Sequence, residues 1–222
     1  MSSTSDRTAS LVLLRHGESE GNAHDVFTGW LNPPLTSAGA REARQAGERL
    51  RDEGVTPTVV YTSVLLRAIQ TASLVMEGLG AGHDVRRNWR LNERHYGALQ
   101  GLSRAEVRDA FGEDQLEKWR RSYDLRPPAA ERGSRACGSG RRPARSASRR
   151  SESLADVAGR LGPLWALIVR RLRAGEVVLI VAHGSPVRIL RQCVEGLTDA
   201  ETEVLDVPLA VPFVYRSPVR DL

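Results

Sequence analysis

The sequence predicts a single α/β domain with a mostly parallel sheet and helices on both faces. Two apolar runs, residues 11–14 and 177–182, are short and do not alternate with polar residues, which favours strands covered on both faces. A third run at 59–61 is followed by a helical pattern, and a strand followed by a helix is typical of parallel sheets. Residues 1–10 are polar and expected to be frayed, so the domain is assigned to 11–222.

Two helices are predicted in the first half of the chain. Thr36 can cap a helix that runs to residue 50, because the apolar residues that follow it fall on one face and Gly54 stands where a stop is expected. The strand at 59–61 leads into a second helix, from about residue 64 to residue 79. These elements form the first strand-and-helix units of the sheet.

The second half contains two further helices and the last strand. Residues 102–121 are expected to be one helix, whose inner face consists of Val107, Ala110, Phe111 and Leu116. A longer helix begins at Ser151 and continues to residue 172, and Gly175 ends it. The run at 177–182 then forms the most strand-like segment of the chain.

Residues 127–150 form a low-complexity insert that is predicted to be disordered. The insert holds three prolines and three glycines but no bulky apolar residue, so it cannot bury enough surface to order itself. Within it, residues 131–150 carry seven arginines and one glutamate, a net charge of +6 in a chain of net charge +5. The basic character therefore belongs to this segment. A divergent insert and a reading-frame slip that later recovers would both give such a sequence.

Composition excludes several classes of protein. Residues 131–150 contain no aromatic side chain, so the basic stripe with interleaved aromatics of a nucleic-acid binder is absent. The longest uncharged apolar run has six residues, against the roughly 20 that a membrane span needs. Two cysteines and a start without an apolar signal segment favour a reducing compartment. We therefore expect a cytoplasmic protein that binds neither nucleic acid nor membrane.

Two histidines follow apolar strands and point to one site. Arg15, His16 and Gly17 follow the first apolar run, and His183 and Gly184 follow the last. Ligands bind beyond the carboxyl ends of the strands in an open parallel sheet, so the two imidazoles converge on one crevice if these strands are neighbours. Each glycine would let the backbone come close to a bound group. The alternative is that both are strand-end histidines whose nitrogens are satisfied by backbone.

These residues favour a phosphate site. Arg67, one helical turn into the next helix, brings a second guanidinium to the same sheet edge, and the planar fork of arginine matches phosphate bidentately. A neutral imidazole nitrogen is a competent nucleophile toward phosphorus, and cationic surroundings keep His16 partly deprotonated. A metal site is the competing use, but the five histidines offer no close pair with a third ligand in register. No metal is assigned.

The motifs resemble those of the histidine phosphatase superfamily, and specifically its 2,3-bisphosphoglycerate-dependent phosphoglycerate mutases. The residues that carry the resemblance are Arg15-His16-Gly17-Glu18-Ser19, Asn22, Phe27-Thr28-Gly29-Trp30, Tyr61-Thr62-Ser63-Val64-Leu65, Arg67-Ala68-Ile69, the block from Leu91 to Gly101, Trp119-Arg120-Arg121, Glu152-Ser153-Leu154 and Ala182-His183-Gly184. Arg-His-Gly alone marks only the superfamily, whereas the block from Asn92 to Gly101 narrows it to the mutases.

The resemblance implies a role for each matching residue. His16 would be the phosphorylated nucleophile and Glu93 the proton donor and acceptor, with Arg15, Arg67 and His183 around the transferring phosphoryl group. The substrate-binding residues that it implies are Ser19, Asn22, Thr28, Gly29, Arg94, His95, Tyr96, Arg104, Arg120, Arg121, Gly184 and Ser185. Independently, a carboxyl next to a phosphate dianion has a raised pKa, which suits Glu93 to general acid catalysis.

Other interpretations of these residues stay open. Glu93 could be a surface glutamate paired with Arg94, and Thr28-Gly29-Trp30 could be a turn with a packing tryptophan. Arg120 and Arg121 could equally be the solvated end of a helix, where the helix dipole favours cations. The sequence alone does not separate these interpretations.

The chain departs from the mutase pattern at several points. Arg104 stands where the family usually has Lys, and Ser185-Pro186 stands where it has Asn after the second His-Gly. Pro186 removes one N–H from the phosphate-facing helix end. The family usually continues beyond the equivalent of Leu222 with a tail over the active site, so we expect water to compete for the phosphorylated His16.

The function implied is phosphoglycerate mutase activity in glycolysis and gluconeogenesis. The enzyme would interconvert 3-phosphoglycerate and 2-phosphoglycerate, with 2,3-bisphosphoglycerate as the priming phosphoryl donor and a small phosphorylated acid as its partner. A homo-oligomer is possible, because oligomers are usual in the family. A phosphomonoesterase that uses the same phosphohistidine, or a degenerate phosphate-binding protein, is the alternative.

Overall fold

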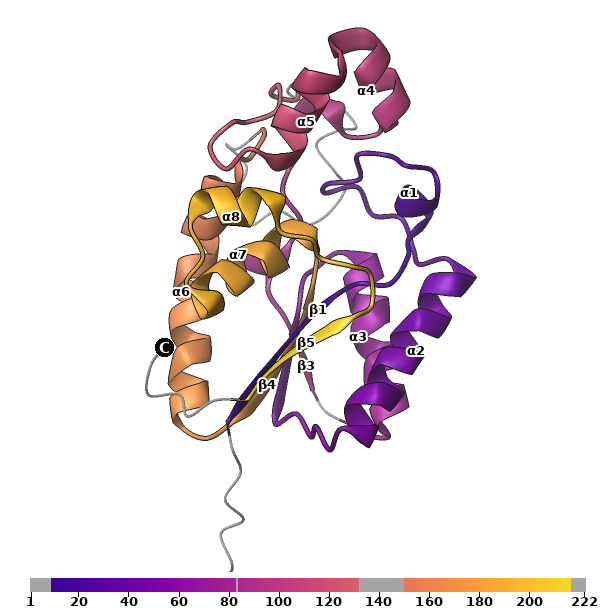
Figure 1. Cartoon of the computed structure of the whole chain (residues 1–222). Helices are drawn as coiled ribbons and strands as arrows, with labels where there is room; N and C mark the ends of the chain where they lie inside the picture. Colours follow the sequence, from indigo (N-terminus) through magenta and orange to yellow (C-terminus); the bar gives the residue numbers. More distant parts are fainter. Residues whose placement is uncertain (1–8, 83, 132–149, 217–222) are drawn as a thin grey trace, which may run out of the picture.

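The computed structural model describes residues 9–82, 84–131 and 150–216. Its centre is a five-stranded sheet in the order β3-β2-β4-β1-β5 (Figure 1). The strands are β1 (Ser10–Arg15), β2 (Val59–Thr62), β3 (Val85–Arg87), β4 (Val177–Ala182) and β5 (Pro212–Arg216). The first four are parallel, and β5 pairs with β1 in the antiparallel direction. The predicted fold class is confirmed.

Helices cover both faces of this sheet (Figure 1). α2 (Ser37–Asp52) and α3 (Leu66–Leu79) lie on one face, and α6 (Leu154–Arg173) and α7 (Gly184–Glu195) lie on the other. Alternate residues of β1 enter the two cores, with Val12 on the side of α2 and Leu13 on the side of α6. Both are fully buried, which explains why these strands are apolar without a break.

The remaining elements are short and lie mostly beyond the carboxyl ends of the parallel strands (Figure 1). They are α1 (Glu20–Ala23), the 3-10 turns η1 (Trp89–Leu91) and η2 (Gly97–Leu99), α4 (Arg104–Phe111), α5 (Glu113–Arg121) and α8 (Asp199–Val204). This layer supplies a wall above the sheet edge. Within the ranges that the structure describes, no helix is long and apolar enough to cross a bilayer.

The single helix predicted for residues 102–121 is wrong. The segment forms two helices, α4 and α5, which meet at Gly112 with φ of +84°, a conformation that favours glycine. Val107 and Leu116 are buried as expected, but Ala110 is exposed and Phe111 is 50% exposed. The turn at Gly112 rotates the second helix away from the continuous periodicity on which the prediction relied.

The predicted boundaries of the domain need two adjustments. Ser10, assigned to the frayed end, is the first residue of β1 and is buried; residues 1–8 lie outside the described residues. Of the predicted insert, residues 132–149 lie outside them as well. Of its described first residues, Pro127 and Ala130 are buried, and the Ala130 N–H donates to the carbonyl of Arg150 at 3.1 Å. The helix expected from Ser151 begins at Leu154 as α6, capped by Ser153.

Candidate functional site

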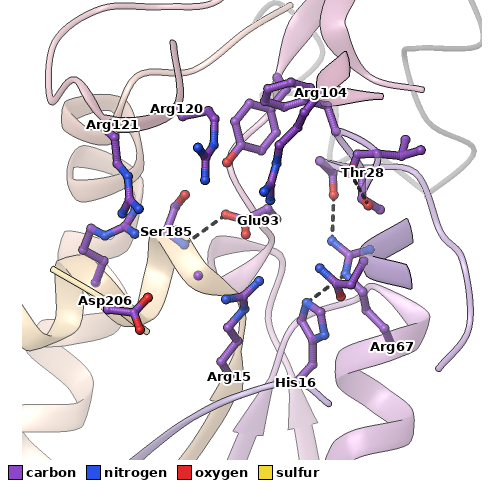
Figure 2. Close-up of a pocket in the computed structure, with 17 residues that line it drawn as sticks. Arg15, His16, Thr28, Arg67, Glu93, Arg104, Arg120, Arg121, Ser185 and Asp206 are labelled. Carbon is purple, nitrogen blue, oxygen red and sulfur yellow. Dashed lines mark hydrogen bonds between the residues drawn. The ribbon is translucent and has the colours of Figure 1, made fainter. Parts of the chain in front are cut away.

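A pocket lies beyond the carboxyl ends of β1 and β4 (Figure 2). The pocket is lined by Arg15, His16, Asn22, Val26, Phe27, Thr28, Gly29, Arg67, Glu93, Tyr96, Arg104, Arg120, Arg121, Gly184, Ser185, Arg188 and Asp206. Six of these residues are arginines and two are acidic, so its wall is strongly cationic. Because parallel strands place their carboxyl ends at one edge, residues far apart in the sequence meet here.

His16 is held as a neutral imidazole. The residue is buried, its Nδ1 lies 2.7 Å from the carbonyl oxygen of Gly17, and Arg67 Nε donates to its Nε2 at 3.2 Å. A guanidinium only donates, so Nε2 carries the lone pair and Nδ1 the proton. Burial, and then the positive charges of Arg67 and Arg15, lower the pKa of His16 well below its ordinary value of 6.5. The nitrogen that faces Arg67 is therefore available as a nucleophile.

His183 lies beside His16 because β1 and β4 are neighbours in the sheet. Arg15 pairs with Ala182 in the parallel register, and the two imidazole centroids are 5.0 Å apart, edge to face. His183 Nε2 lies 2.8 Å from the hydroxyl of Ser63, and its buried Nδ1 has no hydrogen-bond partner among the described residues. Burial, with the charge of Arg67 next, lowers the pKa of His183 well below 6.5. The two imidazoles lie close together as expected, but only His16 is among the residues that line the pocket.

Arg67 and Arg15 are anchored in different ways. Arg67 is buried, and its Nη1 and Nη2 donate to the carbonyls of Leu31 and Gly29, both at 2.9 Å. These hydrogen bonds fix the loop that lines the pocket. Burial lowers its pKa to about 10, which leaves it charged at neutral pH. Arg15 donates from Nη1 to the carbonyl of Val207 at 2.7 Å, while its buried Nε has no partner in the described part of the chain.

Glu93 is buried on the opposite side of the pocket (Figure 2). Its Oε1 accepts hydrogen bonds from the N–H groups of Arg94 at 2.8 Å and Ser185 at 3.1 Å. Burial raises the pKa of Glu93, but these hydrogen bonds and the charges of Arg67 and Arg15 outweigh it, so the pKa lies below 4.5. The raised pKa that suits a general acid is therefore not a property of the protein groups alone, and needs the negative charge of a bound phosphate.

A second group of cations closes the far side of the pocket. Arg104 begins α4 and pairs with Asp25 at 3.0 Å, while Arg120 and Arg121 end α5 and pair with Glu117. Arg120 and Arg121 are also at the carboxyl end of that helix, as the alternative interpretation had it, yet both line the pocket. The predicted Asn22, Thr28, Gly29, Tyr96, Gly184 and Ser185 line it as well.

Three residues expected to bind substrate are buried and do not line the pocket. Ser19 caps α1, where its hydroxyl and backbone share the side chain of Asn22. His95 accepts the N–H of Gly97 with its Nδ1 at 3.0 Å. Arg94 is fully buried and donates to the carbonyls of Trp119 and Arg120 at 2.9 and 2.8 Å. These three residues support the wall, because each lies next to residues that do face the pocket.

The two His-Gly pairs need a glycine for different reasons. A Cβ on Gly17 would lie 2.3 Å from the carbonyl oxygen of Gly39, so Gly17 permits a close approach to helix α2 and not to a ligand. A Cβ on Gly184 would meet the carboxylate of Glu93 at an ordinary 3.5 Å, and Gly184 lines the pocket. The predicted approach of backbone to a bound group fits only the second glycine.

Sequence reasoning missed several residues of the site. Ser63 orients His183. It belongs to the motif from Tyr61 to Leu65, for which the resemblance implied no role. Arg188 and Asp206 line the pocket from α7 and from the loop before β5. Arg188 lies one helical turn after Gly184 in α7, which is a usable signal, whereas nothing near Asp206 in the sequence marks it.

No group of three or more histidine, cysteine, aspartate or glutamate side chains with metal-binding geometry occurs within residues 9–82, 84–131 and 150–216. Among the described residues, the arginines of the pocket supply the positive charge that would attract a bound anion.

Known proteins are similar to this chain in sequence over most of its length. The model of the histidine phosphatase superfamily (branch 1) matches residues 11–211. A 2,3-bisphosphoglycerate-dependent phosphoglycerate mutase of Nocardia farcinica is 45% identical over 214 residues, which cover 94% of this chain and 86% of the relative. A mutase of the same name from Mycobacterium tuberculosis is 46% identical over 218 residues, with coverage of 94% and 85%.

Solved structures similar to this one include phosphatases. A mycobacterial glucosyl-3-phosphoglycerate phosphatase is 29% identical with a TM-score of 0.72, over 93% of this chain and 92% of that one. A mycobacterial hydrolase gives the same TM-score at 28% identity, over 93% and 90% of the two chains. The resemblance to the phosphoglycerate mutases stated from the motifs is thus confirmed by curated relatives of that name, and the chain belongs to branch 1 of the histidine phosphatase superfamily.

Proposed function

We propose that this chain is a phosphoglycerate mutase that interconverts 3-phosphoglycerate and 2-phosphoglycerate through a phosphorylated His16. The observation that carries the proposal is the neutral, buried His16, whose Nε2 faces Arg67 in a pocket with Arg15 and Glu93. The mutases that align over 94% of the chain support the same reaction.

The site fits a bound phosphoryl group. The buried Nε of Arg15 and the buried Nδ1 of His183 both lack a partner within the described residues, and a buried polar atom without a partner is costly. The hydroxyl of Ser63 accepts the N–H of Leu65 at 3.1 Å, so its proton is free to go to His183 Nε2. That arrangement leaves Nδ1–H as a donor. Arg15 and His183 would then both donate to phosphate oxygens.

Phosphoryl transfer would use the groups in the following way. The N–P bond to His16 Nε2 forms as the P–O bond to the departing oxygen breaks, and Arg67 moves its Nε–H from the imidazole to a phosphate oxygen. 2,3-bisphosphoglycerate would supply the phosphoryl group that primes His16. Arg104, Arg120 and Arg121 would hold the carboxylate and the remaining phosphate of the ligand.

Glu93 would move the proton. The carboxyl is ionised when only the protein groups act on it, so it can accept the proton of an attacking hydroxyl. A bound dianion raises its pKa, so the same group can hold the proton and return it to the departing oxygen. Its position is fixed by backbone N–H donors from Arg94 and Ser185, which keeps the carboxylate aimed into the pocket.

A second candidate function is phosphomonoester hydrolysis by the same phosphohistidine. The similar solved structures include a glucosyl-3-phosphoglycerate phosphatase, and the pocket residues that would hold a phosphoryl group serve both reactions equally. The two reactions differ only in whether water or a ligand hydroxyl accepts the phosphoryl group from His16.

One experiment decides between these functions. The chain is incubated with 3-phosphoglycerate and a trace of 2,3-bisphosphoglycerate, and 2-phosphoglycerate and free phosphate are followed together. We expect 2-phosphoglycerate to form in large excess over phosphate, and a requirement for the bisphosphate trace. Phosphate in excess would identify a phosphatase, and the absence of both products would contradict an enzymatic role on this substrate.

A further inference from the structure

Asp206 is an acidic residue in a cationic pocket, and it has no role in the proposed reaction. The other acidic residue of the wall, Glu93, is buried and hydrogen-bonded, whereas Asp206 is exposed and its carboxylate makes no hydrogen bond or ion pair with the described residues. Figure 2 shows this carboxylate on the Arg121 side of the pocket. A negative charge at this position weakens the binding of anions, which are the ligands that the arginines favour.

The backbone around Asp206 is held firmly by arginines. Arg188 Nε donates to the carbonyl of Leu205 at 3.0 Å, and Arg191 Nη1 donates to the carbonyl of Asp206 itself at 3.1 Å. On the other side, Arg15 Nη1 donates to the carbonyl of Val207 at 2.7 Å. Two of these arginines also line the pocket. The cations thus fix the place of Asp206 through its backbone and leave the carboxylate oxygens free to accept.

A fixed carboxylate distinguishes ligands by their charge and by their donors. The oxygens of Asp206 can accept a hydrogen bond from a hydroxyl but repel a second phosphate group. Phosphoglycerates differ in this respect, because a monophosphate keeps one free hydroxyl and the bisphosphate has a dianion in its place.

We propose that Asp206 is a specificity-determining residue, which favours a monophosphorylated hydroxy acid over the bisphosphorylated acid in this pocket. This inference rests on the proposed function. One consequence is that the bisphosphate formed at His16 is held less firmly than the six arginines alone would hold it. Asp206 therefore limits how long the bisphosphate stays bound between the two phosphoryl transfers.

Replacing Asp206 tests the charge and the hydrogen bond separately. Asp206→Asn removes the charge and keeps an acceptor oxygen, so it should tighten the bisphosphate by about fivefold, the effect of one partly screened unit charge several ångströms away. Asp206→Ala should tighten the bisphosphate equally but should bind the monophosphate a few-fold more weakly than Asp206→Asn does, because the hydroxyl loses its acceptor. The exposed, unpartnered carboxylate makes loss of folding an unexpected result for either variant.

The measurement is calorimetric titration in a His16→Ala background, so that no phosphoryl group is transferred. The ligands are 2,3-bisphosphoglycerate, 3-phosphoglycerate and inorganic phosphate. The matched control is Asp109→Asn, which removes the same charge from an exposed position on α4 outside the pocket. We expect the ratio of the two dissociation constants to shift toward the bisphosphate in Asp206→Asn and to stay unchanged in Asp109→Asn.

Three results would overturn the inference. An unchanged ratio in Asp206→Asn would overturn it alone and leave the proposed function standing, and so would an equal shift in Asp109→Asn. Binding of inorganic phosphate without binding of either glycerate would count against the proposed function and the inference together.

Discussion

His16 owes its reactivity to neighbours that are fixed by the end of β1. The carbonyl of Gly17 determines which nitrogen carries the proton, and Arg67 occupies the other nitrogen until a phosphate competes for it. Burial lowers the pKa of His16, so its imidazole is already neutral and does not have to lose a proton before it attacks. The same imidazole on a surface helix would be solvated and a weaker nucleophile for lack of positioning.

We predict that His16→Ala removes all mutase and phosphatase turnover. No other imidazole within the described residues has both an arginine donor on one nitrogen and a place in the pocket wall. The check combines product assays with labelled phosphate transfer to the protein. His24→Ala is the control, since His24 is exposed and bonds only the carbonyl of Glu20. Label on His183, or more than trace turnover, would contradict the assignment of His16.

Glu93→Gln should slow phosphoryl transfer by about 10²–10⁴-fold. The amide keeps the shape of the side chain and its oxygen can still accept from Arg94 and Ser185, but it cannot carry the proton. Binding of inorganic phosphate should be retained, which calorimetry would show. A rate loss of less than about tenfold would mean that Glu93 is structural.

The sequence predicts the position of a residue at the end of a strand better than that of a residue in a loop. His16 and His183 follow apolar strands, and they meet because β1 and β4 are neighbours in the parallel sheet. Ser19 and Arg94 belong to the same motifs as pocket residues, yet they turn into caps and buried anchors, because only the folded backbone decides on which side of a loop a side chain lies.

At the scale of elements, helix α6 supports the segment that carries Glu93. Arg160 lies within α6, forms a buried ion pair with Glu152 at 2.9 Å, and donates to the carbonyls of Asn92 at 2.7 Å and Glu93 at 3.0 Å. Glu152 in turn accepts the N–H of His95 at 3.0 Å. This network ties the loop after η1 to the helix, although nothing in the helical periodicity of α6 indicates a polar residue with this task.

Arg160→Met should cost about 3–5 kcal/mol of unfolding free energy, because it leaves the buried carboxylate of Glu152 without its partner. Activity at a temperature where the variant is folded should also fall, since Glu93 loses a support of its backbone. Arg126→Met is the control, because Arg126 is mostly exposed where it pairs with Asp156. Urea unfolding measures both, and equal losses in the two variants would refute the argument.

The loop before β5 contains a strained position. Ala210 is buried with φ of +50°, and its N–H donates to the carbonyl of Arg15 at 3.1 Å. A left-handed conformation costs an L residue about 1–2 kcal/mol, whereas glycine adopts it freely and loses some of that gain in entropy. We predict that Ala210→Gly stabilises the chain by about 0.5–1 kcal/mol in urea unfolding. Ala46→Gly, in the interior of α2, should instead destabilise it by about 1 kcal/mol.

The elements themselves were predictable where local signals agree. Thr36 caps α2 with its side chain, and Gly175 ends the turn after α6 with φ of +80°, both as their residue types suggest. The break at Gly112 was missed, because a glycine between two helical patterns is tolerated within one helix as well as between two. Leu116 and Trp119 of α5 pack in one hydrophobic cluster with Phe27, and this packing favours two helices over one.

For the whole molecule, the site is a property of the topology. β1, β2 and β4 are adjacent in the sheet although about 120 residues separate the last two in the sequence, and each delivers residues to one edge. Alternating apolar strands and helices predict this sheet, but the order of its strands follows from packing. For that reason Asp206, which enters the pocket from the loop before β5, could not be placed from sequence patterns.

The buried histidines make the stability of the whole chain depend on pH. The pKa values of His16 and His183 are lowered in the folded state, chiefly by burial and then by Arg67, while in the unfolded chain they lie near 6.5. Below about pH 6.5 the unfolded chain therefore binds more protons than the folded one, and the free energy of unfolding falls as the pH is lowered. The lowered pKa of Glu93 acts in the same direction, but only below about pH 4.5.

We predict that the free energy of unfolding in urea falls between pH 6.5 and 5, and that His16 and His183 each contribute a slope that approaches about 1.4 kcal/mol per pH unit. His183→Gln keeps an acceptor for Ser63 and removes one titrating group, so its slope should be smaller than that of the unsubstituted chain by up to about 1.4 kcal/mol per pH unit. His24→Gln, at an exposed position, is the control for replacing a histidine by glutamine. Parallel curves for the unsubstituted chain and His183→Gln would show that the buried imidazoles do not control acid unfolding, because removing a group that resists protonation must flatten the pH dependence.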